Sequence, residues 1–213
     1  MYNSDPFAET RLEVLHGLIA AHPLGTLVTQ GPDGLCADHV PFEIGAPTAA
    51  APFGVLRAHV ARANPLWRTQ RHSEQSLVVF QGPQAYITPA WYEEKALSGK
   101  VVPTYNYAVV HAHGALTVVD DPAWLLALLE RLTTRHEAGR PVPWKVGDAP
   151  PAHLERLLTA IIGIEMPVNR IEGKWKVSQN RSPTDQATIA TGLAADGTQA
   201  SAAMAAMMSA LTA

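Results

Sequence analysis

Residues 24–44, LGTLVTQGPDGLCADHVPFEI, decide the fold class of this chain. Residues 24–29 and 35–44 are rich in apolar and β-branched side chains, and the segment QGPDG at 30–34 has the composition of a turn. The stretch therefore predicts a β-hairpin, in which the second strand pairs back on the first.

The rest of the chain continues this pattern of short strands with helices between them. A first helix is predicted over residues 9–21, because Leu12, Leu15, Leu18 and Ile19 recur at helical spacing. Further strands are predicted at 53–60, 76–80, 85–88 (the last two broken by Gly82-Pro83), 103–119 and 161–176, the last of these a strand pair that turns at Glu172-Gly173.

Polar residues followed by prolines mark the later helix starts. Asn64-Pro65 and Asp121-Pro122 each place a capping side chain before a proline that suits the first helical turn. The second of these helices has a predicted buried face of Trp124, Leu125, Leu128, Leu129 and Leu132. Further helices are predicted over residues 148–160 and after the capping box at 182–185.

Hairpins and scattered helices without a regular strand–helix–strand rhythm indicate an α+β fold with a mostly antiparallel sheet. About six strands with Gly and Pro at the corners suit a small β-barrel with peripheral helices. Residues 1–193 are predicted to form this domain, and residues 194–213 an Ala/Met-rich C-terminal tail that we expect to be a frayed or loosely docked helix.

The composition narrows the functional classes. Sixteen basic against nineteen acidic residues give a net charge of -3, whereas a direct DNA binder normally carries a basic excess, so we do not expect direct DNA contact. The single cysteine, Cys36, excludes an intramolecular disulfide. Without a signal-peptide pattern or an apolar run long enough to span a bilayer, the sequence predicts a cytoplasmic protein that does not enter the membrane.

The segment HVARANP at 59–65 is the first candidate for ligand binding. A strand is predicted to end here and a capped helix to begin, which would bring Arg62, backbone N–H groups and Asn64 toward one point. Such an arrangement binds phosphate, since a guanidinium offers a planar pair of donors and a helix N-terminus carries partial positive charge. The alternative is that Arg62 forms a surface ion pair and Asn64 only caps the helix.

Two further segments have chemical potential. KWKVSQN at 174–180 places Lys174, Lys176 and Ser178 on one face of a strand and Trp175 on the other, which suits an anionic aromatic ligand or a solvated strand edge guarded by lysines. His111 and His113 alternate along a strand, as paired metal ligands often do, although strand histidines more often serve as hydrogen-bonded packing residues.

Taken in order, these segments resemble the PaiB family, described as FMN-binding negative transcriptional regulators. The resemblance covers nearly the whole chain and rests on the runs PLGTLVT at 23–29, HVARANP at 59–65, FQGPQAYI at 80–87, VPTYNY at 102–107, PWK at 143–145 and GKWKVSQN at 173–180.

The resemblance implies an FMN-binding split β-barrel like that of the pyridoxamine-phosphate oxidases, in which two subunits form a homodimer with FMN between them. It implies a phosphate end near Arg62, and flavin contacts from the residues His39, His59, Val60, Ala61, Asn64 and Gln81, with Lys174, Trp175 and Lys176 reaching the flavin from the partner subunit. The chain departs from the oxidases in having VARA at 60–63, with fewer cations for a phosphate.

Three functions follow as hypotheses. The first is a PaiB-type negative regulator that binds FMN and acts indirectly, through a small molecule or a protein partner. The second is a flavin-dependent oxidoreductase of the pyridoxamine-phosphate-oxidase or flavin-reductase kind, with His39 and His59 as proton donors. The third is a haem- or metal-binding protein that uses His111 and His113, although no metal-ligand spacing singles out a site.

Overall fold

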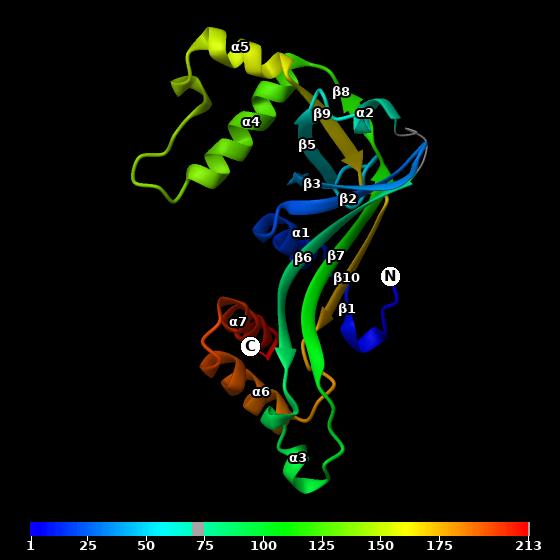
Figure 1. The fold of residues 1–213 in the computed structure, drawn as a ribbon, viewed down its shortest axis with the longest axis vertical. Coiled ribbons are helices and arrows are strands. Elements are labelled where there is room, and N and C mark those ends of the chain that lie inside the picture. Colours follow the sequence, from blue (N-terminus) through cyan, green and yellow to red (C-terminus); the bar gives the residue numbers. More distant parts are fainter. Residues whose placement is uncertain (70–74, 213) are drawn as a thin grey trace. The chain divides into compact units, whose positions relative to one another are not determined.

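The computed structural model describes residues 1–69 and 75–212 (Figure 1). The strands are β1 Ala8–Glu9, β2 Leu24–Gly31, β3 Gly34–Pro41, β4 Glu43–Gly45, β5 Val55–Ala61, β6 Gln75–Ile87, β7 Thr104–Ala115, β8 Thr117–Val119, β9 Ile161–Pro167 and β10 Arg170–Lys176. The helices are α1 Leu12–Ala21, α2 Leu66–Thr69, α3 Glu94–Leu97, α4 Pro122–Glu137, α5 Pro151–Thr159, α6 Pro183–Ala195 and α7 Gln199–Thr212.

The strands form two sheets, one of six strands in the order β1-β10-β7-β6-β2-β3 and one of four in the order β4-β5-β9-β8. The pairs β1–β10, β2–β3, β2–β6, β4–β5, β5–β9 and β8–β9 are all antiparallel. The predicted α+β class with mostly antiparallel sheets is therefore confirmed.

The chain divides into two compact units. Unit 1 comprises Met1–Ala21, Gln81–His111 and Glu172–Ala213, and unit 2 comprises His22–Phe80 and Ala112–Ile171. The long strands β6 and β7 each contribute one part to either unit.

The predicted hairpin opens unit 2. Strands β2 and β3 pair from Leu24 opposite Pro41 to Gly31 opposite Gly34, and Gly34 takes the positive φ of 111° that the tight turn requires. The second strand was predicted to run to residue 44 without a break. It instead ends at Pro41, because Phe42 is fully buried and donates its backbone N–H to the carbonyl of Pro23, and the chain then enters the other sheet as β4.

In the four-stranded sheet of unit 2, strand β5 buries one of its two faces. Along β5 the side chains of Leu56, Ala58 and Val60 are buried, while Arg57 and His59 alternate with them on the other face. Helix α4 packs on β5 and β9. It begins as predicted at Asp121, whose Oδ1 accepts a hydrogen bond from the N–H of Ala123 at 2.9 Å.

A glycine in β9 sets the distance between the sheet and α4. A Cβ atom at Gly163 would lie 2.5 Å from the indole of Trp124 and 2.8 Å from the carbonyl oxygen of Val119. Gly163 also pairs directly with His59 of β5. The helix can therefore approach β9 only because residue 163 has no side chain.

In unit 1, helix α1 buries Leu15, Leu18 and Ile19 as the periodicity predicts. The predicted break of β6 at Gly82-Pro83 is wrong, since the strand runs without interruption to Ile87. A Cβ at Gly82 would lie 2.8 Å from Cδ1 of Leu18, so the glycine lets α1 approach a continuous strand.

The last two strands differ from the prediction. Strands β9 and β10 were expected to form one hairpin turning at Glu172-Gly173, but they belong to different sheets, and both of these residues lie inside β10. Gly173 is fixed there by packing, since a Cβ atom would lie against the side chains of Leu15 and Trp175 and the carbonyl oxygen of Glu9. A glycine that makes room for neighbours was thus misread as a turn.

The C-terminal segment is packed more firmly than expected. Residues 199–212 form α7, and its Met204 and Met208 are buried in a cluster with Ile189, Leu193 and Ile87. The loosely docked helix predicted for this tail is therefore wrong for the described residues. Methionines supply the apolar volume on the buried side of a helix that is otherwise mostly alanine.

Among the described residues, every helix is too short or too polar to cross a lipid bilayer.

Candidate functional site

Unit 2 contains a groove of about 390 Å³ between β3 and β5. Its walls come from two strands of different sheets, the loop that follows β5, and the first residue of β9. The lining residues are Asp38, His39, Val40, Pro41, His59, Val60, Ala61, Asn64 and Ile161. The structure therefore gathers the predicted residues His39, His59, Val60, Ala61 and Asn64 around one hollow.

Asn64 holds the rim of this groove in place. Its Oδ1 accepts the backbone N–H of Leu66 at 2.8 Å, which confirms the predicted capping role. Its Nδ2 donates to Oδ1 of Asp38 at 2.9 Å and so ties the loop after β5 to β3. Sequence reasoning missed Asp38, although a carboxylate inside the apolar strand segment CADHV was a signal for it.

His59 has an unsatisfied polar atom inside the fold. Its Nδ1 is buried and has no hydrogen-bond partner among the described residues. Burial lowers the pKa of the His59 imidazole below its ordinary value of 6.5, so the ring is neutral at neutral pH. Since buried polar atoms are normally paired, Nδ1 of His59 is an atom that a bound ligand would satisfy.

Arg62 is already engaged by protein groups. Its Nη1 and Nη2 donate to the two carboxylate oxygens of Asp120 at 2.9 and 2.6 Å, and its Nε donates to the carbonyl of Thr159 at 2.9 Å. These side-chain hydrogen bonds raise the pKa of Arg62 and lower that of Asp120. A guanidinium has five N–H donors, so donors remain for a ligand.

Three of the backbone amides at residues 62–66 donate to groups of the protein itself. The N–H of Arg62 donates to Ala160, that of Asn64 to Ala61, and that of Leu66 to the Asn64 side chain. The helix that follows, α2, spans only Leu66–Thr69. These three amides therefore already have partners, and the alternative of an Arg62 ion pair with a capping Asn64 describes the observed contacts.

The other predicted site residues belong to unit 1. Lys174 is buried, and its Nζ donates to the carbonyl of Tyr2 at 3.0 Å and lies 5.7 Å from the centre of the Tyr107 ring. Trp175 is also buried, and Gln81 is exposed on β6. The alternative of a solvated edge strand is wrong at Lys174, which is buried and pairs with Ala8 of β1.

Lys176 is held by its neighbours on β7. Its Nζ donates to Oγ1 of Thr104 and to the carbonyl of Tyr105. Burial, together with the positive charges of Arg181 and Lys174, lowers the pKa of Lys176. An anion bound beside this ammonium group would therefore stabilise its charged form.

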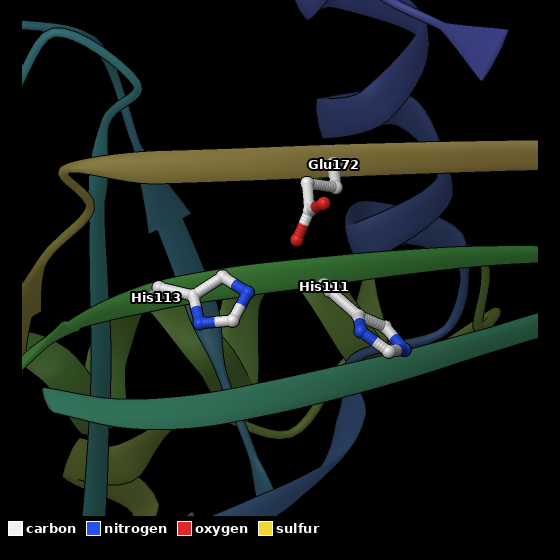
Figure 2. Close-up of side chains that lie close together, drawn as sticks. All are labelled: His111, His113 and Glu172. Carbon is white, nitrogen blue, oxygen red and sulfur yellow. The ribbon is translucent and has the colours of Figure 1, made fainter. Parts of the chain in front are cut away.

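Of the two strand histidines, His111 lies close to the carboxylate of Glu172. Figure 2 shows His111 and His113 on β7 and Glu172 on β10, and within unit 1 the ligand atoms of His111 and Glu172 lie within 4.8 Å of each other. His113 belongs to unit 2, where its Nδ1 lies 3.0 Å from Nη2 of Arg170. A guanidinium at that distance disfavours a cation at Nδ1 of His113. The haem or metal hypothesis stays a prediction.

The antiparallel sheets are those of a split-barrel fold. Residues 1–170 match the family model described as "Putative FMN-binding domain", and the chain belongs to this family. The cofactor that the family describes is FMN.

Relatives agree with this membership over nearly the whole chain. An uncharacterised protein of Emericella nidulans is 34% identical over 94% of this chain and 93% of its own length. The Bacillus subtilis protease synthase and sporulation protein PAI 2 is 32% identical over 89% of this chain and 87% of its own. Among solved structures, the flavocytochrome Anf3 of Azotobacter vinelandii has the same fold, with a TM-score of 0.61 at 12% identity over 79% of this chain and 69% of that one.

Proposed function

We propose that this chain is a homodimeric FMN-binding protein whose flavin ring lies in the groove between β3 and β5. The observation that carries the proposal is the hollow that brings His39, His59, Ala61 and Asn64 together with the carboxylate of Asp38.

The groove residues suit the ring better than the phosphate. The pyrimidine edge of a flavin offers one N–H donor between two carbonyl acceptors, and Asp38 can accept from the donor while the histidines can donate to the carbonyls. The carboxylate of Asp38 would repel a phosphate. We assign the phosphate end of FMN to the guanidinium of Arg62, which keeps N–H donors beyond those that bind Asp120.

The remaining predicted contacts depend on the dimer. In this proposal Gln81 lies near the flavin, and Lys174, Trp175 and Lys176 approach it from the partner subunit. The lowered pKa of Lys176 supports this, because a phosphate beside the ammonium would compensate the burial that now disfavours its charged form.

The biological role that we propose is negative transcriptional regulation by an indirect route in the cytoplasm. The Bacillus subtilis relative is named for protease synthesis and sporulation, which are regulated processes. The net charge of -3 disfavours direct operator contact, so a small molecule or a protein partner is expected to transmit the signal.

A second candidate is a flavin-dependent oxidoreductase. Bound FMN supplies hydride transfer, and the protein has only to bind and orient the reactants and to manage protons. The neutral imidazole of His59, with one ring nitrogen unpaired, favours this candidate because such a group can hold or release a proton at neutral pH.

Titration of the purified protein with FMN, followed by flavin fluorescence and by sedimentation, tests the proposal. Saturable quenching at one flavin per subunit of a dimer is the expected result, and a monomer that does not quench would contradict it. Retention of operator DNA in a mobility-shift assay at physiological salt would contradict the indirect route. Bleaching of the bound flavin by a nicotinamide cofactor, with reoxidation by an added acceptor, would favour the oxidoreductase.

A further inference from the structure

A second hollow of about 300 Å³ lies in unit 2 beneath α4. Leu129, Leu132 and Thr133 of α4 form one wall, and Trp144 from the segment after the helix forms another. Pro41 and His59 complete it, and both of them also line the groove assigned to the flavin ring. The two hollows therefore share His59.

The apolar wall of this hollow is the part of the α4 face that the core does not fully bury. Of the leucines predicted to be buried along α4, Leu125 and Leu128 are 1% and 0% exposed, whereas Leu129 and Leu132 are only partly buried. Trp144 is 49% exposed. Its backbone N–H donates to Oε2 of Glu137 at 3.1 Å, which ties the segment that carries the indole to α4. An aromatic side chain beside half-buried leucines offers a surface for a flat apolar molecule.

His59 contributes a polar atom to the wall of this hollow. Its buried Nδ1 has no partner among the described residues. The tautomer of a neutral imidazole decides whether Nδ1 donates or accepts, and a hydroxyl group can satisfy either case because it does both. Of the charged side chains that line the hollow, Glu137 already accepts from Arg140 at 2.9 Å.

We propose that this hollow is a binding site for a small, neutral, single-ring aromatic molecule that carries a hydroxyl group, with the hydroxyl bonded to His59. Its volume lies at the lower end of the range for small-molecule pockets, about 300–1,000 Å³. Among the described residues that line it there is no lysine or arginine, which disfavours an anionic ligand. If this hollow is the effector site of the regulator, that role rests on the indirect route proposed above. The binding of the aromatic molecule itself does not require FMN.

Phenol and toluene separate the two parts of this proposal, since the rings are alike and only phenol carries a hydroxyl. Ligand-observed NMR on the full chain, without FMN and again with saturating FMN, gives both affinities. The wild type is expected to bind both molecules and to prefer phenol by about tenfold, the worth of a hydrogen bond to a buried polar atom.

Leu129→Trp fills the hollow and is expected to abolish the binding of both molecules. Leu157→Trp is the matched control, because Leu157 lies on α5, is 46% exposed, and is not among the residues that line either hollow. His59→Phe is expected to bind toluene as before and to lose the preference for phenol. Circular dichroism and a melting curve confirm that each variant is folded.

Three results would overturn the proposal. The wild type would bind neither molecule, Leu129→Trp would bind phenol as the wild type does, or Leu129→Trp would change the oligomeric state, which would mark the hollow as a contact between copies. An FMN titration of the same samples separates the two proposals, because loss of FMN binding with phenol binding intact would contradict only the flavin assignment.

Discussion

Asn64 donates a hydrogen bond from Nδ2 to Oδ1 of Asp38 at 2.9 Å, and this bond joins the loop after β5 to β3 across the rim of the groove. Asn64→Asp isolates the bond, because aspartate caps the following helix as well as asparagine does but turns the donor into a second carboxylate. We expect the free energy of unfolding to fall by about 1–3 kcal/mol, since an acceptor then faces an acceptor.

Urea denaturation at pH 7 measures this loss. The exchanged pair, Asn64→Asp with Asp38→Asn, is the control, because it restores one donor opposite one acceptor. The double variant should recover more than half of the lost stability. If it is no more stable than Asn64→Asp alone, the bond does not hold the rim.

Arg62 is predicted to distinguish FMN from riboflavin, which lacks the phosphate. Arg62→Ala should weaken FMN binding by about tenfold or more, because charge-assisted bonds to phosphate are strong, and should change riboflavin binding by less than about twofold. Flavin fluorescence titrations with both ligands give the ratio.

Arg57→Ala is the matched control for Arg62. Arg57 lies on β5, which ends one residue before Arg62, and it likewise pairs with a carboxylate, its Nε lying 2.7 Å from Oε1 of Glu165. This variant should leave the ratio of FMN to riboflavin affinity unchanged. An equal loss of both flavins in Arg62→Ala would mean that Arg62 supports the fold through Asp120 and Thr159 and does not meet the phosphate.

The opening hairpin and most helix starts could be predicted because their signals are local. The turn at residues 30–34 and the caps at Asn64, Asp121 and Ser182 depend on neighbouring residues, and each was found at its place. Sheet membership could not be predicted in this way. Gly82 and Gly173 read as breaks in the sequence, but each makes room for a side chain of α1 that is distant along the chain.

In the candidate site, too, some features could be predicted from the sequence and others depend on residues that are distant along the chain. His39, His59, Ala61 and Asn64 follow from the family resemblance and line one groove. The partner that occupies Arg62 could not be predicted, because Asp120 lies 58 positions further along and nothing local points to it.

His59 should make the stability of the fold depend on pH. In the unfolded chain its imidazole takes up a proton near the ordinary value of 6.5, and burial lowers the pKa in the folded state. Between these two values the unfolded chain holds more protons, so the free energy of unfolding decreases as the pH falls below 6.5.

The variant His59→Gln should therefore flatten the dependence of stability on pH between 7 and 5, as measured by urea denaturation. His39→Gln is the control, because His39 lines the same groove but is exposed. The other titratable groups that line the two hollows, Asp38, His136 and Glu137, are present in both variants. An NMR titration that places the His59 pKa at or above 6.5 would refute the expectation.

Gly163 is predicted to be intolerant of a side chain. Gly163→Ala places a methyl group 2.5 Å from the Trp124 indole and 2.8 Å from the Val119 carbonyl, and the backbone atom cannot yield. We expect a loss of about 1–3 kcal/mol in the free energy of unfolding. Gly139→Ala, which meets nothing within 4 Å, should be nearly neutral in the same urea experiment. Equal stability of the two variants would show that α4 does not pack closely against β9 at residue 163.

The most direct test of the central claim is FMN binding by two variants that differ only in where a tryptophan is placed. Ala61 lines the groove and Ala63 does not, and both side chains are exposed, so neither substitution disturbs the core. If the flavin ring lies between β3 and β5, Ala61→Trp should abolish the saturable quenching of FMN fluorescence while Ala63→Trp binds FMN like the wild type. Equal FMN affinity in both variants would contradict the assignment of this groove to the flavin.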